Sequence, residues 1–159
     1  MRPHTQPTPQ SHRVASRFEE RTHESVDPLR VVHLSTYDVA GGAARAAHRI
    51  HNGLRGAGIQ SVMFVREARS RDESIVSFQP TRKLFARIGR TIRRERIRRI
   101  LRHWTTPDDM EPFRLDRSEY GADLVSNLPR ADIVNLHWVA DFVDYPSFFD
   151  SLPGTIPIV

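Results

Sequence analysis

The feature that most constrains the fold is a strand, a glycine-containing loop, a helix and a second strand that follow one another within residues 29–65. Residues 29–35 (LRVVHLS) are a short run of β-branched and apolar side chains, which is typical of a strand buried in a parallel sheet. Residues 43–54 are rich in alanine with apolar side chains at helical spacing, and residues 60–65 (QSVMFV) predict the second strand. This order predicts a βαβ unit, and therefore a Rossmann-like parallel sheet of the α/β class with flanking helices.

Later segments continue the pattern. Residues 132–138 (DIVNLHW) predict a third strand, and residues 155–159 (TIPIV) predict the start of a fourth. Short helices are expected within residues 120–128 and 142–152. Residues 66–80 are polar and predict a loop or a short excursion.

The positive charge is concentrated in one segment. The chain has 24 Lys and Arg against 19 Asp and Glu, a formal net charge of +5. Residues 81–104 hold nine Arg, one Lys and one Glu (net +9), whereas residues 105–159 hold three Arg and ten acidic residues (net −7). Apolar residues at helical spacing predict that residues 81–104 are an amphipathic helix, with a slip of about one position near Glu95 and Arg96.

Three interpretations of this basic helix remain open. The first is a solvated face on a helix packed against the sheet. The second is a helix bound to an anionic membrane surface through Arg93, Arg94, Arg98 and Arg99. The third, a nucleic-acid-binding helix, ranks last because no aromatic stacking platform accompanies the arginines and residues 105–159 are acidic. Nucleic acid is therefore not expected as a partner.

Composition excludes several other classes. With no cysteine, the chain has no disulfide framework, thiolate zinc site or cysteine nucleophile, and no metal site is predicted. No apolar run reaches the roughly 18–20 residues of a membrane span. Because the N-terminus lacks a signal-peptide stretch, the cytoplasm is the expected location. Residues 1–28, rich in Pro, His, Ser, Thr and Gln, are expected to be a disordered tail before a domain at residues 29–159.

The junction between the first strand and the helix carries the strongest functional signal. Gly41 and Gly42 let the backbone approach a ligand closely, and the helix that follows presents free amides and its positive dipole end. Phosphate or diphosphate is the ligand expected at Gly41, Gly42 and Ala43. The alternative, a glycine pair that only makes a tight turn, has about equal weight, because the three-glycine dinucleotide pattern and the P-loop lysine are absent.

A second signal lies at the end of the third predicted strand. His137 lies near the carboxyl end of this strand, and the carboxyl ends of strands in an open α/β sheet face the ligand crevice. A histidine there, with Asn135 two residues earlier, could hydrogen-bond a sugar hydroxyl or a phosphate. Taken alone, His137 is better explained as a histidine satisfied by local backbone.

Together, the stretches VVHLSTYDVAGGAARAAHRIHNGLRGAGIQSVMFVRE and ADIVNLHWVADFV resemble the N-terminal domain of bacterial family 4 glycosyltransferases. The resemblance implies a retaining hexosyltransferase of the GT-B architecture, in which two Rossmann-like domains face each other across a cleft. The C-terminal domain would grip a nucleotide-sugar and the N-terminal domain a glycan or lipid-linked acceptor, in polysaccharide or cell-surface glycan synthesis. The loop at Gly41 and Gly42 would approach the donor diphosphate, and no further cofactor is implied.

Two departures qualify the resemblance. Asn135 stands where the family usually has the first histidine of His-x-His-Trp. The chain also ends at Val159, before the family's Thr-x-His-Asp segment and donor domain. We therefore expect residues 29–159 to be an incomplete acceptor-side domain, from a truncated reading frame or a split enzyme with a separately encoded donor domain. No catalytic residue is assigned, and no transferase activity is expected of this chain alone.

The alternative function belongs to another class. The chain would be a non-catalytic membrane-surface or polyanion-binding module that acts through residues 81–104, peripheral at the inner membrane face.

Overall fold

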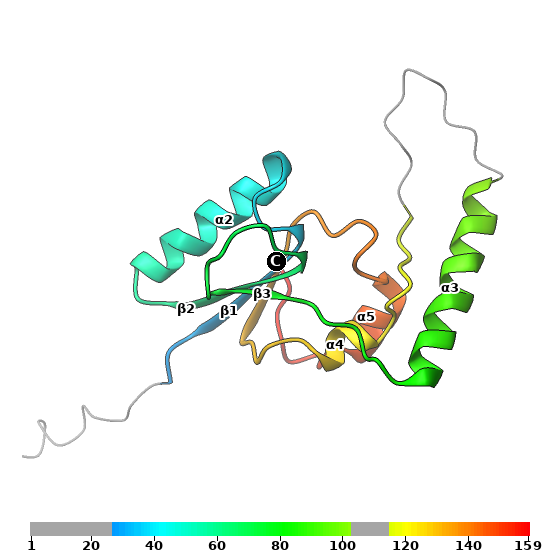
Figure 1. The fold of residues 1–159 in the computed structure, drawn as a ribbon. Coiled ribbons are helices and arrows are strands. Elements are labelled where there is room, and N and C mark those ends of the chain that lie inside the picture. The colour runs from blue at the N-terminus through cyan, green and yellow to red at the C-terminus, as the bar shows by residue number, and fades with distance from the viewer. Residues whose placement is uncertain (1–26, 103–114) are drawn as a thin grey trace, which may run out of the picture.

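A four-stranded, all-parallel sheet forms the centre of the molecule (Figure 1). The structure, a computed structural model, describes residues 27–102 and 115–159. The strand order is β3-β2-β1-β4, so the first strand of the chain lies between the second and the last. The parallel α/β class expected from the strand and helix order is therefore confirmed. The strands are β1 (Arg30–Tyr37), β2 (Gln60–Glu67), β3 (Ile75–Ser77) and β4 (Ile133–Leu136).

The predicted helices are all present in the described residues; residues 103 and 104, at the end of the predicted segment 81–104, lie outside them. The two long helices form near the predicted segments 43–54 and 81–104, and the short ones form within 120–128 and 142–152. Among the helices of the described residues, none combines the length and apolar character needed to cross a bilayer. Residues 1–26, which make up most of the predicted tail, lie outside the described part. The helices are α2 (Gly41–Gly56), α3 (Leu84–Arg102), α4 (Asp123–Ser126) and α5 (Tyr145–Ser151).

The segment 66–80, predicted as a loop or a short excursion, contains the strand β3. This three-residue strand pairs in parallel with β2, with Met63 opposite Ile75. Three residues are too few to show a strand period, so the strand is specified by its pairing with β2.

The predicted last strand is present as a short extension of the sheet. The Val159 amide donates to the Val134 carbonyl at 2.9 Å, and the Leu136 amide donates to the Val159 carbonyl at 2.8 Å. A single parallel bridge joins Val134 to Ile158, so this segment lies beside β4 at the edge of the sheet.

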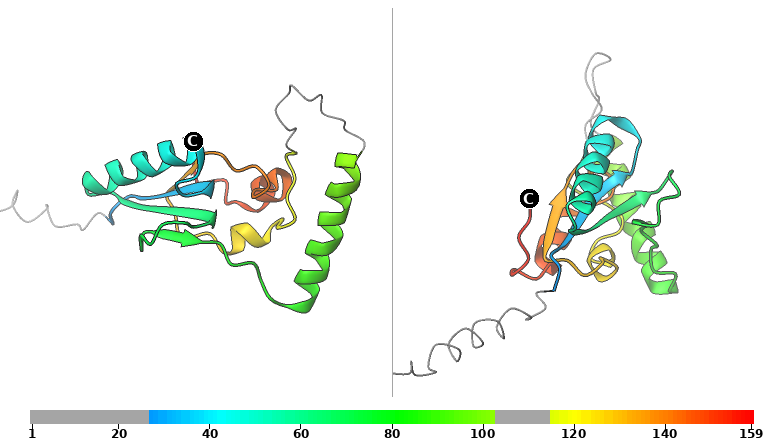
Figure 2. Two further views of the ribbon diagram at one scale, coloured as in Figure 1. Left: turned by 45° about the horizontal axis from the view of Figure 1, so that its top comes forward. Right: turned by 90° about the vertical axis from the view of Figure 1, so that its left-hand side faces the viewer.

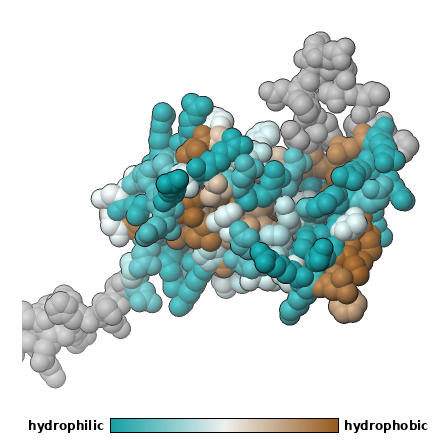
Figure 3. All heavy atoms as spheres, in the orientation of Figure 1, coloured by the Kyte–Doolittle hydropathy of each residue, from teal (hydrophilic) through white to brown (hydrophobic). Residues whose placement is uncertain are grey.

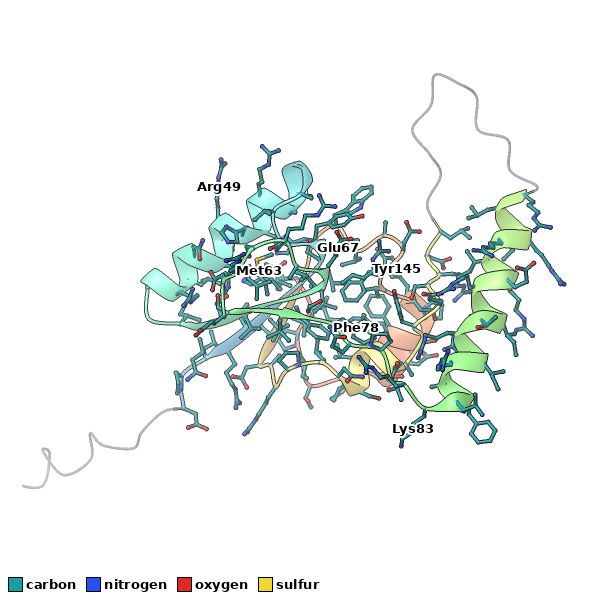
Figure 4. The ribbon with its side chains drawn as sticks, in the orientation of Figure 1. Arg49, Met63, Glu67, Phe78, Lys83 and Tyr145 are labelled. Carbon is teal, nitrogen blue, oxygen red and sulfur yellow. The ribbon has the colours of Figure 1, made fainter. Side chains whose placement is uncertain are left out.

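The two faces of the sheet are covered differently. Val32, Leu34 and Val134 belong to the main core, which includes Phe148 of α5 and Leu124 of α4. The opposite face lies under α2, where Met63 and Val65 pack with Ala47 (Figures 2 and 4). Because side chains alternate along a strand, His33 and Ser35 of β1 share this second face.

Helix α3 stands to one side of the sheet, beyond α4 and α5 (Figures 1 and 2). None of its residues is buried. Its backbone lies close to no other helix or strand of the described residues. The interpretation of α3 as a helix packed against the sheet is therefore wrong.

Candidate functional site

The carboxyl ends of β1 and β4 are joined by hydrogen bonds at one edge of the sheet. The Thr36 amide donates to the Trp138 carbonyl at 2.7 Å, and the His137 amide donates to the Leu34 carbonyl at 3.0 Å. The Thr36 hydroxyl donates to the Ala140 carbonyl at 2.9 Å. These bonds bring the glycine loop and the segment after β4, about a hundred residues apart in the chain, to the same edge.

The first turn of α2 lies open at this edge. The N-cap residue, Ala40, offers no side-chain hydrogen bond, and the first turn contains no acidic residue. A Cβ added at Gly41 or Gly42 would meet no atom within 4 Å, and Gly41 has a φ of +86° that favours glycine. Gly41, Gly42 and Ala43 are all exposed. Their unpaired amides and the helix dipole make this turn suited to an anion.

Asp38 shapes the loop before this turn. Its fully buried carboxylate accepts hydrogen bonds from the backbone amides of Val39 at 2.9 Å, Arg69 at 3.0 Å and Ser70 at 2.7 Å. Burial by itself would raise the pKa of Asp38, but the bonds from Ser70 and Arg69 outweigh it and the pKa is lowered. Asp38 therefore stays ionised and ties the loop to the segment after β2. No local pattern in the sequence distinguishes Asp38 from other loop residues.

Ser35 adds a buried hydroxyl on the face under α2. The residue is 0% exposed, and its Oγ has no hydrogen-bond partner in the part of the chain that the structure describes. Buried hydroxyls are nearly always hydrogen-bonded, so Ser35 is a polar group of β1 whose bonding the described residues do not satisfy.

His137 contacts a second histidine instead of the local backbone. Its Nε2 lies 3.0 Å from Nδ1 of His33, and the two rings stack with their centroids 5.2 Å apart. Burial, followed by the neighbouring His137 and His51, lowers the pKa of His33 to about 4. Burial also lowers the pKa of His137. Both rings are therefore neutral near pH 7, and one donates the shared hydrogen bond to the other.

His51 of α2 has a structural role. Its Nδ1 lies 2.8 Å from the Ser61 hydroxyl and its Nε2 lies 2.8 Å from the Ser74 hydroxyl, so both ring nitrogens are used. This buried histidine joins α2 to β2 and to the residue that precedes β3. A histidine on the buried side of a predicted helix was the signal in the sequence that could have indicated it.

The glycine turn and His137, which were predicted to form one ligand site, lie at the same end of the sheet but do not line the same hollow. His137, Trp138 and Ala140 line a hollow of about 280 Å³ together with Asp116 and Tyr145. Gly41 and Gly42 are not in its lining. Asn135 is half-buried and pairs in register with His33, so it lies on the face of the sheet that α2 covers in part.

The four arginines predicted to form an anionic-surface site point in different directions. Arg93 donates from Nε to the Glu119 carbonyl at 2.8 Å, and Arg94 forms an ion pair with the Glu119 carboxylate. Arg98 and Arg99 instead lie near Glu95, at 4.0 and 3.6 Å. Arg93 and Arg94 therefore attach α3 to the rest of the molecule.

The chain matches no model of a known protein family, no curated protein and no solved structure. Residues 27–102 and 115–159 also contain no group of three or more His, Asp or Glu side chains placed to hold a metal ion. The polar groups of the candidate site include the α2 amides, the Ser35 hydroxyl and the neutral His137 ring.

Proposed function

We propose that residues 29–159 are the acceptor-side domain of a glycosyltransferase that acts in polysaccharide or cell-surface glycan synthesis. The observation that carries the proposal is the open first turn of α2, with Gly41 and Gly42, at the same sheet edge as His137. The parallel α/β sheet supports a Rossmann-like domain of the GT-B type. In that architecture a second domain, in the same chain or on a partner, grips the nucleotide-sugar, and the cytoplasm is the proposed location.

Each part of the edge has a role in this proposal. The amides of Gly41, Gly42 and Ala43 bind the donor diphosphate, because they are exposed and lack acceptors from the first turn itself. His137 and Asp116 line the hollow of about 280 Å³, and the neutral ring and the carboxylate can both hydrogen-bond the hydroxyls of a sugar acceptor. Asn135 of β4 pairs in register with His33 of β1, so it adds a polar side chain to the face of the sheet that carries His33.

Transfer needs a positioned donor and stabilisation of charge on the leaving diphosphate. The helix amides contribute to the second requirement, but no described group of this edge fixes the nucleotide or the sugar. The chain alone is therefore proposed to bind diphosphate without catalysing transfer.

The test is an amide chemical-shift titration of the ¹⁵N-labelled chain with UDP, ADP and GDP, and with UMP for comparison. The diphosphates should shift the amides of Gly41, Gly42 and Ala43, whereas UMP should shift them much less. Gly42→Asp places a carboxylate at the anion site and should weaken diphosphate binding at least tenfold.

Gly154→Asp is the matched control, because Gly154 is exposed, meets no atom within 4 Å of an added Cβ and precedes the segment 157–159 that pairs with β4. It adds the same charge and should leave binding unchanged. Equal weakening by both variants, or no shift at the α2 amides, contradicts the proposal. Incubation with radiolabelled UDP-hexose and an acceptor should yield no product, and turnover by the chain alone would overturn the non-catalytic assignment.

A further inference from the structure

Helix α3 is attached to the molecule by one side. Arg90 pairs with Asp123 at 3.5 Å, Arg93 donates to the Glu119 carbonyl and Arg94 pairs with the Glu119 carboxylate. Ile97 lines the small hollows on the same side, next to Ser118. These contacts define the inner side of α3 and leave the opposite side unpartnered in the described part of the chain.

The slip in the apolar pattern divides the apolar residues of α3 between its two sides. At about 100° per residue, Leu84, Ile88 and Ile92 lie roughly opposite Arg93 and Ile97. Phe85 is adjacent to them. These four side chains are 47% to 87% exposed, and we call them the outer patch: Leu84, Phe85, Ile88 and Ile92. Apolar residues gather at the end of α3 where the helix begins (Figure 3).

Cationic side chains surround the outer patch. Arg82 and Lys83 precede it and are exposed, and Lys83 points away from the rest of the molecule (Figure 4). Arg87 and Arg96 flank the patch on the helix surface, and both are exposed. Farther along the same outer side lie Arg99 and Arg102, which share Glu95, the one acidic residue of α3.

We infer that the outer side of α3 binds the surface of a lipid bilayer that contains anionic phospholipids. A helix in the plane of the headgroups buries an apolar patch at the acyl boundary and places its arginines among the phosphates. The outer patch and the cations around it place an apolar surface and positive charge on one side of α3. The contacts of Arg90, Arg93 and Arg94 hold the opposite side to the protein.

The outer patch suits a lipid surface better than it suits nucleic acid or a second copy of the chain. Nucleic acid would pair with the arginines but would leave Leu84, Ile88 and Ile92 in water, and the outer patch has a single aromatic ring for stacking. A second copy of the chain would bring two helices of eight arginines and one glutamate against each other, and like charges at close range repel.

The first test is co-sedimentation of the whole chain with vesicles of phosphatidylcholine and phosphatidylglycerol at 7:3, and with pure phosphatidylcholine. The chain should bind the anionic vesicles at least tenfold more tightly. Leu84→Ser/Phe85→Ser/Ile88→Ser keeps every charge and should reduce binding to anionic vesicles at least tenfold. Arg87→Gln/Arg96→Gln should reduce it severalfold and weaken its dependence on salt.

Matched controls use exposed residues on other elements. Ile50→Ser/Phe149→Ser removes apolar side chains that are 46% and 50% exposed, and Arg45→Gln/Arg49→Gln removes two exposed charges from α2. Both should bind like the unmodified chain, and circular dichroism should show that every variant is folded.

A second test reports insertion directly. Because the chain has no cysteine, Phe85→Cys can carry a single environment-sensitive fluorophore, and Asn52→Cys on the exposed side of α2 is its control. Emission from position 85 should rise and shift to the blue on anionic vesicles, while emission from position 52 should not change.

Three results would overturn the inference. The first is unchanged vesicle binding by the outer-patch variant. The second is binding of a 20-nucleotide RNA that competes fully with vesicles and does not depend on the outer patch. The third is a dimer in sedimentation velocity that the outer-patch variant dissociates, with no binding to vesicles. Diphosphate binding at Gly42 is independent of all three, so the two proposals fail separately.

Discussion

Asp38 shows how a single buried charge organises the loop before α2. Its carboxylate is fully buried and accepts hydrogen bonds from three backbone amides, which come from its own loop and from the segment after β2. An aspartate after a predicted strand is common at turns, so the sequence did not distinguish it from other loop residues. The partners that give Asp38 its role lie about thirty residues away, and only the folded chain brings them together.

Asp38→Ala should lower the free energy of unfolding by about 1–3 kcal/mol, because it leaves three part-buried backbone amides without an acceptor. Urea denaturation followed by circular dichroism measures the change. Asp150→Ala, at an exposed position, is the control and should change stability by less than about 0.5 kcal/mol. A loss at Asp38 no greater than at Asp150 would contradict the assigned role.

His33 makes stability depend on pH. Its pKa is about 4 in the folded chain against an ordinary value of 6.5, so the unfolded chain binds more protons between these values. The free energy of unfolding should therefore fall as the pH drops from about 6.5 to 4, by about 3 kcal/mol from this residue. Denaturation at pH 7, 6, 5 and 4 measures it, and His33→Leu should flatten the dependence. A His33 ring resonance that titrates near pH 6.5 by NMR would be inconsistent with this account.

At the scale of secondary-structure elements, α2 and α3 differ in how they are held. Helix α2 buries Ala44, Ala47 and His51 against β1 and β2, so its apolar face packs on the sheet. Helix α3 buries none of its residues and is held by arginine side chains. Both helices were predicted from periodicity, because helical spacing is a local property. The partner of each face depends on long-range contacts, so helical spacing left three interpretations of α3 open, and the structure excludes packing against the sheet.

Two glycines of α2 should respond in opposite directions to alanine. Gly41 has a φ of +86°, which strains an alanine, so Gly41→Ala should lower the free energy of unfolding by about 1–2 kcal/mol. Gly53 lies inside α2 with open space around an added Cβ, so Gly53→Ala should raise it by about 0.5–1 kcal/mol. Thermal and urea unfolding measure both, and a stabilising Gly41→Ala would refute the assigned conformation.

At the scale of the whole molecule, an aromatic cluster joins the layer of α4 and α5 to the sheet. Phe142 is fully buried and lies 5.7 Å from Phe78, and 6.2 Å from both Phe64 and Tyr120, between ring centroids. These rings come from β2, from the residue after β3 and from the segments around α4 and α5. The short helices α4 and α5 therefore depend on this cluster for their position.

Phe142→Ala should lower the free energy of unfolding by about 3–5 kcal/mol, because it opens a cavity in the middle of this cluster. Phe149→Ala removes the same side chain from a site that is 50% exposed and should cost less than about 1 kcal/mol. Differential scanning calorimetry of the two variants makes the comparison. Similar losses would show that the cluster does not hold the layers together.

The amino-acid sequence by itself determined the order of the main strands and helices, the parallel α/β class and the place of the glycine turn at Gly41 and Gly42. These features follow from local periodicity, glycine conformation and the rule that strands joined through helices run parallel. The tertiary structure decided which groups meet: His33 with His137, Asp38 with the amides after β2, and Arg93 and Arg94 with Glu119. It also decided that the outer patch of α3 faces away from the protein. The physical reason is that these contacts join residues far apart in the chain, and no local pattern encodes the packing that brings them together.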